Sequence, residues 1–362
     1  MRPGRSREFV VSAKAAGLLY VTDSLPGISR RRVGRGFSYV DPDGRVIRER
    51  EHIRRFRSLV IPPAWSDVWI CPTPEGHLQV TARDARGRKQ YRYHPSFRAH
   101  RDHAKFDKMV ELSDVLWQVR ERVERDIALP GLQRDKVMAT LVWLLERTLI
   151  RVGSHELAKE NNSFGLTTLR RRHVSIEGST LCFEFRGKSG VAHAVCVTDR
   201  RIARIVQRCR ELPGRELFQY VDERGKRQIV YADDVNTYLR EITGRDVTAK
   251  DFRTWMGTML AAAALRELGP APTKRAAERN ILAAVDSTAT RLGNTRAVCR
   301  KYYIHPALME AYLEGAVLPP LPESVWQERR ANGPALRRHE AEVLAFLKER
   351  VGARRTSAPK RS

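Results

Sequence analysis

The sequence lacks any apolar stretch long enough to cross a membrane. No uninterrupted apolar run approaches the roughly 18 residues that a spanning helix needs. The run from Phe9 to Val21 follows three arginines, as in a secretory signal, but Lys14 interrupts it and no small-residue cleavage site stands out. We therefore expect a mature N-terminus, no membrane association and a cytoplasmic location.

Cysteine is scarce and its spacing is uninformative. The number is odd, no pair has C-x-x-C spacing, and the residues are scattered: Cys71, Cys182, Cys196, Cys209 and Cys299. Such a pattern favours neither a zinc site nor a disulfide framework. We expect reduced thiols, as in a cytoplasmic protein.

Acidic residues are in deficit. The 362 residues include 67 Lys and Arg against 42 Asp and Glu, which gives a formal net charge of +25. Because each phosphate neutralised by a cation releases counterions, this excess favours a polyanionic partner, and double-stranded DNA is the first expectation. We see no compact carboxylate cluster of the kind that holds magnesium in nucleases. The sequence thus predicts a site built from cationic side chains, with no metal and no other cofactor.

Residue composition and the spacing of apolar residues divide the chain into two parts. Residues 20–98 are rich in Pro, Gly, aromatics and short β-type runs, whereas apolar residues recur at helical spacing from about Lys105 onward. We predict an α+β protein with an N-terminal β-rich domain (residues 1–105) and a mostly α-helical domain (106–320). A charged helix and a disordered basic tail containing Arg354, Arg355, Lys360 and Arg361 should follow (321–362).

Two local signals stand out in the helical half. The segments 180–185 and 191–197 flank a Gly-rich turn, which predicts a small β-hairpin with Lys188 at its tip. Thr248 and Asp251 have the spacing of a capping box, which predicts a helix that ends at Leu268 and carries Arg253 in its first turn.

Tyr303 suggests a nucleophile for a phosphodiester if fixed positive charge surrounds it. A phenol with an ordinary pKa of about 10 needs help at two points: the added negative charge must be stabilised and the departing sugar oxygen must be protonated. Arginine suits the first task and lysine the second. The candidates are Arg151, Lys188, Arg253 and Asn294, although their spacing alone proves little in a chain with so many arginines.

Four segments, in order and at similar intervals, resemble motifs of the type IB DNA topoisomerases, particularly the small poxvirus and bacterial enzymes. They are Arg151–Gly153 with Lys159–Leu169, Phe185–Lys188, Lys250–Trp255, and Cys299–Tyr303. The last of these resembles a Ser-Lys-x-x-Tyr nucleophile segment with Cys and Arg in its first two places.

The resemblance extends into the β-rich half. Pro62–Trp65 and the stretch 83–93 are similar to bacterial and poxvirus sequences, and the second stretch resembles the one with which those enzymes contact DNA. The residues expected at DNA are Arg83, Arg86, Arg88, Lys89, Gln90, Tyr91 and Tyr93. The competing interpretation is an arginine-rich strand whose tyrosines pack inward.

The resemblance implies a DNA clamp followed by a catalytic domain, and a monomer that nicks one strand, lets the free end swivel and reseals without ATP or an obligatory metal. It implies that Tyr303 forms a 3′-phosphotyrosyl bond, that Arg151 and Arg253 grip the phosphate, and that Lys188 protonates the 5′ oxygen. Asn294 stands where poxvirus and eukaryotic relatives have histidine. An amide can donate a hydrogen bond but cannot become cationic.

Two other classes of protein remain open. A tyrosine recombinase would use the same nucleophile, but it usually has His-x-x-Arg at the second arginine, where this chain has Lys250. A non-catalytic nucleoid-binding protein could keep the fold without turnover, and Asn294 is the one sequence feature that favours it. Adjacent Tyr302 should point about 100° away from Tyr303 on a helix and serve in packing or in a contact with the DNA backbone.

Overall fold

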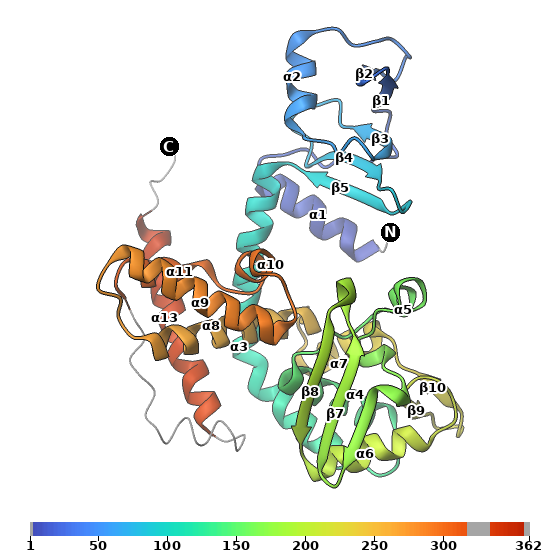
Figure 1. Cartoon of the computed structure of the whole chain (residues 1–362), viewed down its shortest axis with the longest axis vertical. Coiled ribbons are helices and arrows are strands. Elements are labelled where there is room, and N and C mark those ends of the chain that lie inside the picture. The colour runs from blue at the N-terminus through green and yellow to red at the C-terminus, as the bar shows by residue number, and fades with distance from the viewer. Residues whose placement is uncertain (1–2, 317–333, 358–362) are drawn as a thin grey trace. The chain divides into compact units, whose positions relative to one another are not determined.

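The computed structural model describes residues 3–316 and 334–357. The chain forms two compact units, Met1–Lys105 and Phe106–Ser362, and helix α3 (Pro95–Ile127) begins in the first and continues through the second (Figure 1). A β-rich unit followed by a mostly helical one confirms the α+β prediction.

The first unit is built on a five-stranded antiparallel sheet with the strand order β2-β1-β3-β4-β5. Phe56 of the second helix packs on the sheet beside Ile28, Ile70 and Val80, which form the core of this unit. The elements are α1 (Pro3–Ala15), β1 (Ile28–Val33), β2 (Gly36–Val40), α2 (Arg50–Ser58), β3 (Ser66–Ile70), β4 (Leu78–Arg83) and β5 (Lys89–Tyr93).

One arginine of this unit has a structural task. Arg30 on β1 donates hydrogen bonds to the carbonyl oxygens of Ile61, Pro62 and Trp65 at 3.0, 2.9 and 2.8 Å. The three carbonyls belong to the loop that includes Pro62–Trp65, where prolines leave few backbone donors. The guanidinium therefore holds this loop against the sheet.

The second unit gathers its helices around one large hydrophobic core, to which α4, α7 and α8 contribute buried side chains. Its elements after α3 are α4 (Arg134–Thr148), α5 (His155–Asn161), β6 (Val174–Glu177), β7 (Thr180–Arg186), β8 (Ala192–Thr198), α6 (Arg200–Glu211), β9 (Gln219–Val221), β10 (Arg227–Ile229), α7 (Ala232–Thr243), α8 (Ala249–Leu268), α9 (Lys274–Leu292), α10 (Arg296–Tyr302), α11 (Pro306–Leu313) and α13 (Pro334–Ser357).

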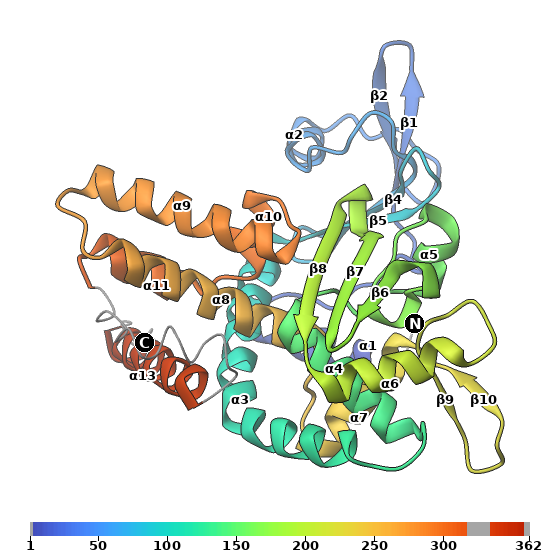
Figure 2. The same ribbon diagram turned by 60° about the horizontal axis from the view of Figure 1, so that its bottom comes forward.

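Both local predictions for this unit are confirmed. Strands β7 and β8 form an antiparallel hairpin with β6 alongside (Figure 2), and Lys188 lies in the connecting 3-10 turn, Lys188–Gly190. Helix α8 has Thr248 as its N-cap, and the Asp251 carboxylate accepts a hydrogen bond from the Thr248 backbone N–H at 2.9 Å. The helix ends at Leu268 as expected.

The prediction of reduced thiols is wrong for two cysteines. Cys182 on β7 and Cys196 on β8 form a disulfide, while Cys71, Cys209 and Cys299 are free and buried. The reason is the strand register, which places residues 182 and 196 directly opposite each other although 14 positions separate them in sequence. Short-range motif spacing does not reveal such a pair.

The C-terminal helix α13 packs within the second unit, and His339, Glu340, Val343 and Leu347 are buried on it. The helix includes positions 354 and 355, so the prediction of a disordered tail is wrong for Arg354 and Arg355. Lys360 and Arg361 lie outside the described residues. None of the helices in the described part of the chain is both long enough and apolar enough to span a bilayer.

Candidate active site

Arg151 is held at the end of α4 by a short paired segment. Leu149, the C-cap of α4, has the left-handed conformation (φ 58°), and the chain then runs beside residues 165–167. The backbone N–H of Leu166 donates to the Arg151 carbonyl at 2.8 Å. A side chain at Gly165 would place its Cβ 2.5 Å from that same oxygen, so glycine is required for this approach.

Arg253 is the fifth residue of α8 and is only 4% exposed. Its Nη2 donates to the carbonyl oxygen of Leu292, the last residue of α9, at 2.7 Å. Burial lowers the pKa of Arg253, and repulsion from Arg151 lowers it further, while the Tyr303 phenol acts in the opposite direction. Two guanidinium groups are therefore held close together inside the protein.

Asn294 follows the left-handed C-cap of α9, Gly293 (φ 59°). One nitrogen of Arg151, Nη2, donates both to the Gly293 carbonyl at 3.1 Å and to Oδ1 of Asn294. The acceptor oxygen of the Asn294 amide is thus occupied by Arg151, and its Nδ2 group is left as the free donor.

Four donor atoms of these three residues are buried without a hydrogen-bond partner among the described residues. They are Arg151 Nη1, Arg253 Nε, Arg253 Nη1 and Asn294 Nδ2. Five other arginines each leave one such atom, so the accumulation is specific to this site. Since an unsatisfied buried donor costs about 1–3 kcal/mol, and more when charged, the cluster favours an anion with several acceptor oxygens.

Tyr303 lies at the C-cap of α10, where its backbone N–H donates to the Cys299 carbonyl at 2.9 Å. The Arg253 guanidinium carbon is 5.4 Å from the centre of the Tyr303 ring. Gly257 of α8 makes this approach possible, because a Cβ there would be 2.5 Å from the Tyr303 carbonyl oxygen. The phenol is therefore a neighbour of the buried arginine.

The neighbours of Tyr303 are less suited to chemistry. Tyr302 is 37% exposed, and the Lys301 ammonium lies 5.4 Å from its ring centre. Cys299 is fully buried, and burial raises the pKa of its thiol to about 11. A thiol that stays protonated at neutral pH is a poor nucleophile.

Lys188 is the one predicted catalytic residue whose side chain is exposed. It is exposed at the hairpin tip, and its ammonium group makes no hydrogen bond or ion pair with the described residues. Ser189 and Gly190 beside it have positive φ angles of 63° and 76°. The structure thus brings Arg151, Arg253, Asn294 and Tyr303 together and presents Lys188 on a tight exposed turn.

His193 on β8 is a site residue that the sequence reasoning missed. Burial lowers the pKa of its imidazole, and the positive charges of Arg151 and Arg253 lower it further. Its ring lies against Gly293, the residue before Asn294, because a Cβ at Gly293 would overlap with Cε1 of the ring. The available signal was the hairpin register, in which residue 193 pairs with Phe185 just before the Lys188 turn.

The residues expected at DNA lie on and around β5 of the first unit. Tyr91 is 48% exposed, and Lys89 lies over its ring at 5.7 Å. Tyr93 stacks on Tyr91 and also contacts Phe9 and Phe97 in an aromatic cluster, so it has a packing role as well.

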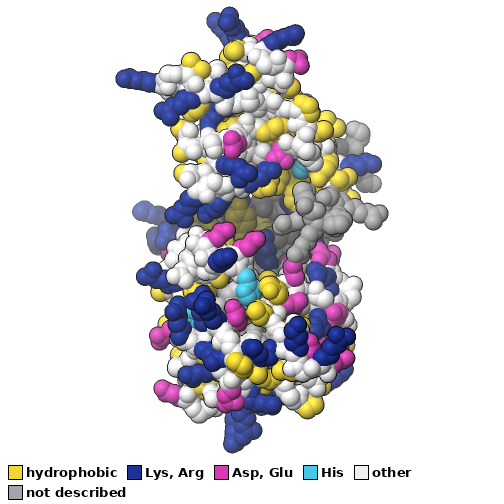
Figure 3. Space-filling view, turned by 90° about the vertical axis from the view of Figure 1, so that its right-hand side faces the viewer, with side chains coloured by type: hydrophobic (Ala, Val, Ile, Leu, Met, Phe, Trp, Pro, Cys, Tyr) yellow, Lys and Arg dark blue, Asp and Glu magenta, His cyan; other side chains and the backbone are white. Residues whose placement is uncertain are grey.

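Several of these side chains organise the β4–β5 turn. Asp84 accepts hydrogen bonds from Arg88 at 2.8 Å and Gln90 at 2.9 Å, and Arg88 is the main cause that lowers the pKa of Asp84 to about 2. Arg83 donates to the Gly87 carbonyl at 2.8 Å, and Arg86 is exposed. Figure 3 shows basic side chains spread over both units on the face displayed.

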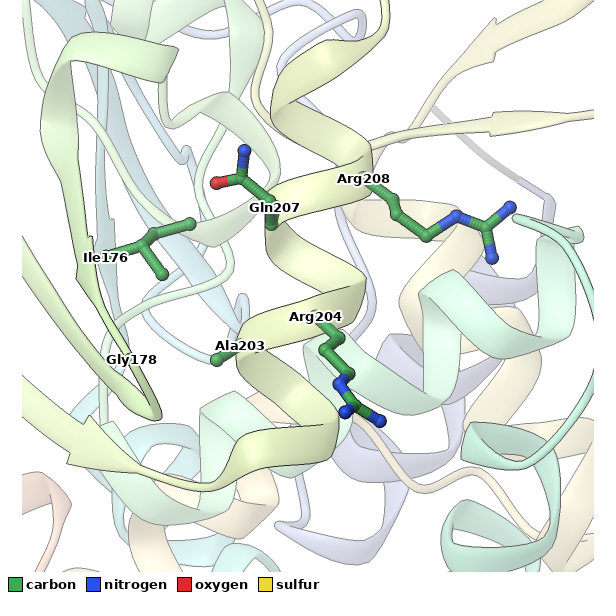
Figure 4. A pocket seen from close by; sticks show the side chains of 6 residues that line it. All are labelled: Ile176, Gly178, Ala203, Arg204, Gln207 and Arg208. Carbon is green, nitrogen blue, oxygen red and sulfur yellow. The ribbon is translucent and has the colours of Figure 1, made fainter.

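A separate open pocket of about 410 Å³ lies between β6 and α6 (Figure 4). Its lining residues are Ile176, Gly178, Ala203, Arg204, Gln207 and Arg208. These six residues include no hydroxyl, thiol or carboxylate, so the pocket has no group suited to nucleophilic or acid–base catalysis.

Two family comparisons cover most of the chain. Residues 94–317 match the catalytic core of eukaryotic DNA topoisomerase I, and residues 36–84 match the N-terminal domain of bacterial DNA topoisomerase IB. The first match includes Arg151, Lys188, Arg253, Asn294 and Tyr303.

Individual relatives agree with these matches. The chain is 30% identical to DNA topoisomerase 1B of Acanthamoeba polyphaga mimivirus over 296 residues, which are 80% of this chain and 88% of the relative. It is 23% identical to DNA topoisomerase 1B of vaccinia virus (strain Copenhagen) over 242 residues, covering 64% of this chain and 72% of that protein.

Proposed function

The chain belongs to the type IB DNA topoisomerase family, and we propose that Tyr303 is the nucleophile with which it cuts one strand of duplex DNA. The enzyme nicks the strand, keeps the 3′ phosphate as a phosphotyrosyl ester, lets the free 5′-hydroxyl end rotate, and reseals. Supercoils are relaxed without ATP, because the covalent bond conserves the energy of the phosphodiester. The recombinase and nucleoid-protein interpretations find no support in the similarities above.

The observation that carries the assignment is the group of four unpaired donors on Arg151, Arg253 and Asn294, with Arg253 beside the Tyr303 ring. A phosphodiester has two nonbridging oxygens, each with several lone pairs, and their charge grows as the phenol oxygen attacks. Donors that are already buried and oriented stabilise this charge without reorganisation in the transition state. Arg151 and Arg253 supply the positive charge, and the Asn294 amide supplies a neutral hydrogen bond.

The covalent step balances with the residues available. The Tyr303 oxygen forms a bond to phosphorus and its proton passes to water. The bond from phosphorus to the 5′ oxygen breaks, and its electron pair stays on that oxygen, which takes a proton from the Lys188 ammonium. Religation runs the same steps in reverse. In this proposal the ammonium group reaches that oxygen from the exposed turn Lys188–Gly190.

Asn294 has two tasks in this scheme. Its Oδ1 accepts the hydrogen bond from Arg151 and fixes the direction of that guanidinium, while its Nδ2 donates to a nonbridging oxygen. An amide cannot supply the positive charge that histidine can, so the two arginines bear more of the stabilisation.

The first unit acts as the DNA clamp in this proposal, with the exposed basic and aromatic residues of the β4–β5 region at the sugar-phosphate backbone. We also propose that the enzyme acts as a monomer in the cytoplasm, at the nucleoid and away from membranes. These points rest on the charge of the chain and on the nature of the substrate.

The test is a plasmid relaxation assay with EDTA and without nucleotide. The wild-type protein should relax negatively supercoiled plasmid and, after rapid denaturation, carry DNA on Tyr303, as peptide mapping by mass spectrometry would show. Tyr303→Phe should abolish both results, whereas the matched Tyr302→Phe should retain them. Relaxation by Tyr303→Phe at the wild-type rate would overturn the assignment.

Relaxation by the wild-type protein should also fail at high salt, because the binding of its cationic side chains to DNA phosphates weakens.

A further inference from the structure

His193 lies where the Lys188 hairpin meets the turn that carries Asn294. On β8 it pairs with Phe185 of β7, and the two rings stack with centroids 4.9 Å apart and 7° between their planes. Residues 193, 195 and 197 are the less exposed positions of β8, so the imidazole lies on the inner side of the strand.

Two glycines from different segments enclose the imidazole. A Cβ at Gly187 would lie 2.6 Å from its Cδ2 and Nε2 atoms, and a Cβ at Gly293 would overlap with its Cε1 atom. Gly187 precedes Lys188, and Gly293 precedes Asn294. One ring therefore touches the residue before each of two proposed catalytic side chains.

The contacts of this ring are steric. Neither nitrogen forms a hydrogen bond with a residue that the structure describes. The groups that act on its charge are Arg151 and Arg253, which together with burial favour the neutral imidazole. A neutral planar ring held between two backbone segments fixes the distance between them.

We propose that His193 is a positioning residue of the cleavage reaction, whose ring sets the Lys188 loop against the Gly293–Asn294 turn and so aims the Lys188 ammonium at the leaving 5′ oxygen. The inference rests on the roles proposed above for Lys188 and the two arginines. The Lys188 ammonium forms no hydrogen bond or ion pair with the described residues that could aim it, whereas the base of its loop is in contact with His193.

The chemistry of the leaving group separates this role from a structural one. In a duplex whose scissile phosphate has a 5′-bridging sulfur, the Tyr303 oxygen bonds to phosphorus, the phosphorus–sulfur bond breaks, and the electron pair stays on a thiolate that needs no proton. A defect that affects only protonation of the leaving group by Lys188 should therefore disappear with this substrate. A defect in folding, DNA binding or phosphate contact should persist.

The experiment is single-turnover cleavage of a duplex that contains a cleavage site mapped with the wild-type enzyme, made with either bridging oxygen or bridging sulfur. With oxygen, His193→Ala should slow cleavage by on the order of 100-fold, as for loss of an aimed general acid. With sulfur, its rate should match the wild-type rate. His193→Gln, whose planar side chain reaches about as far as Nε2, should recover most of the rate with oxygen. Lys188→Ala serves as the reference for complete loss of the acid.

A second pair of variants keeps the test independent of the stability of His193→Ala. Gly187 has an ordinary backbone conformation (φ −91°, ψ −165°), so Gly187→Ala adds only a methyl group that presses on the imidazole. This variant should also cleave slowly with bridging oxygen and at the wild-type rate with bridging sulfur. Adding His193→Ala should slow cleavage little further, because the methyl group then occupies the space that the imidazole leaves vacant. Such non-additivity is the signature of a direct contact.

The proposal is overturned if the His193→Ala defect is equal with oxygen and sulfur, if there is no defect with either, or if the two substitutions are additive. Cleavage of neither substrate by the wild-type enzyme would instead contradict the proposed function. The two failures are thus distinguishable.

Discussion

Arg151 donates a hydrogen bond to the side-chain oxygen of Asn294, and this contact decides which end of the amide can face a phosphate. The same arginine nitrogen also donates to the Gly293 carbonyl. Because Oδ1 is occupied, Nδ2 is the atom that remains for a ligand, and it is buried without a protein partner. In the proposed function, Asn294 therefore acts as a donor whose direction is set by Arg151, the second residue assigned to the phosphate.

The first prediction concerns this donor. Asn294→Asp keeps an acceptor for Arg151 but replaces the Nδ2 group with a carboxylate oxygen, which repels a phosphate. Cleavage in a single-turnover assay should slow by about 10²–10³-fold, the usual loss for one oriented donor in such a site. The fold should persist, as near-ultraviolet circular dichroism can verify. Asn294→His, which restores an N–H donor, should be the more active variant. Equal rates for wild type and Asn294→Asp would show that Nδ2 does not contact the phosphate.

The second prediction concerns the C-terminal helix. Glu340 on α13 is 5% exposed, forms an ion pair with Arg120 at 2.7 Å, and accepts a hydrogen bond at 3.0 Å from Trp255, two residues after Arg253 on α8. Glu340→Ala leaves Arg120, whose side chain is only 15% exposed, with one carboxylate fewer, and it should lower the free energy of unfolding by about 3–5 kcal/mol in urea denaturation.

Glu349 provides the matched control for this experiment, because it is an exposed glutamate on the same helix. Glu349→Ala should change the free energy of unfolding by less than about 0.5 kcal/mol. Equal and small effects of the two substitutions would show that α13 does not stabilise the catalytic unit through Glu340.

The parts of this architecture that the sequence revealed are those with local signals. The hairpin around Lys188 has a Gly-rich turn between two β-type runs, and α8 begins at a Thr248–Asp251 pair three residues apart. The nucleophile and the two arginines were predicted from the resemblance to family motifs. In each case the signal lies within about ten residues of the feature that it predicts.

The parts that the sequence did not reveal depend on contacts between distant segments. Glu340 and Trp255 are 85 positions apart, and His193 approaches Gly293 from another element. The burial of His193 beside two arginines has no counterpart in local hydrophobic periodicity. Such contacts follow from the packing of the whole unit, which no short window of sequence determines.

The third prediction concerns stability in acid. His173 is buried, its Nδ1 accepts a hydrogen bond from the Arg170 backbone N–H at 3.0 Å, and its ring contacts Phe164. Burial, followed by the charges of Arg172 and Arg170, lowers the pKa of His173 to about 4. The unfolded chain binds this proton from about pH 6.5 downward and the folded protein does not. The contribution of His173 to stability is therefore complete above pH 6.5 and is lost as the pH falls toward 4.

The measurement is urea denaturation at several values between pH 7 and pH 4, for the wild type and for His173→Asn. Asparagine keeps a side-chain acceptor near the position of Nδ1 but does not take up a proton. The free energy of unfolding of the variant should fall less steeply over this range, although other groups contribute equally to both curves. Parallel curves would contradict the assignment of this titration to His173.

The fourth prediction concerns the disulfide between Cys182 and Cys196, which closes a loop containing the Lys188 turn. A cross-link between residues 14 positions apart restricts the unfolded chain and should stabilise the oxidised protein by about 3 kcal/mol. Treatment with a phosphine reductant should therefore lower the thermal midpoint of the wild type. The double variant Cys182→Ala and Cys196→Ala should begin at the lower midpoint and not respond to the reductant.

Alkylation before and after reduction, read by mass spectrometry, should label two additional cysteines in the unfolded wild type only after reduction. If all five cysteines are alkylated without reductant, the purified protein holds this pair as thiols, and the hairpin is held by its strand pairing alone.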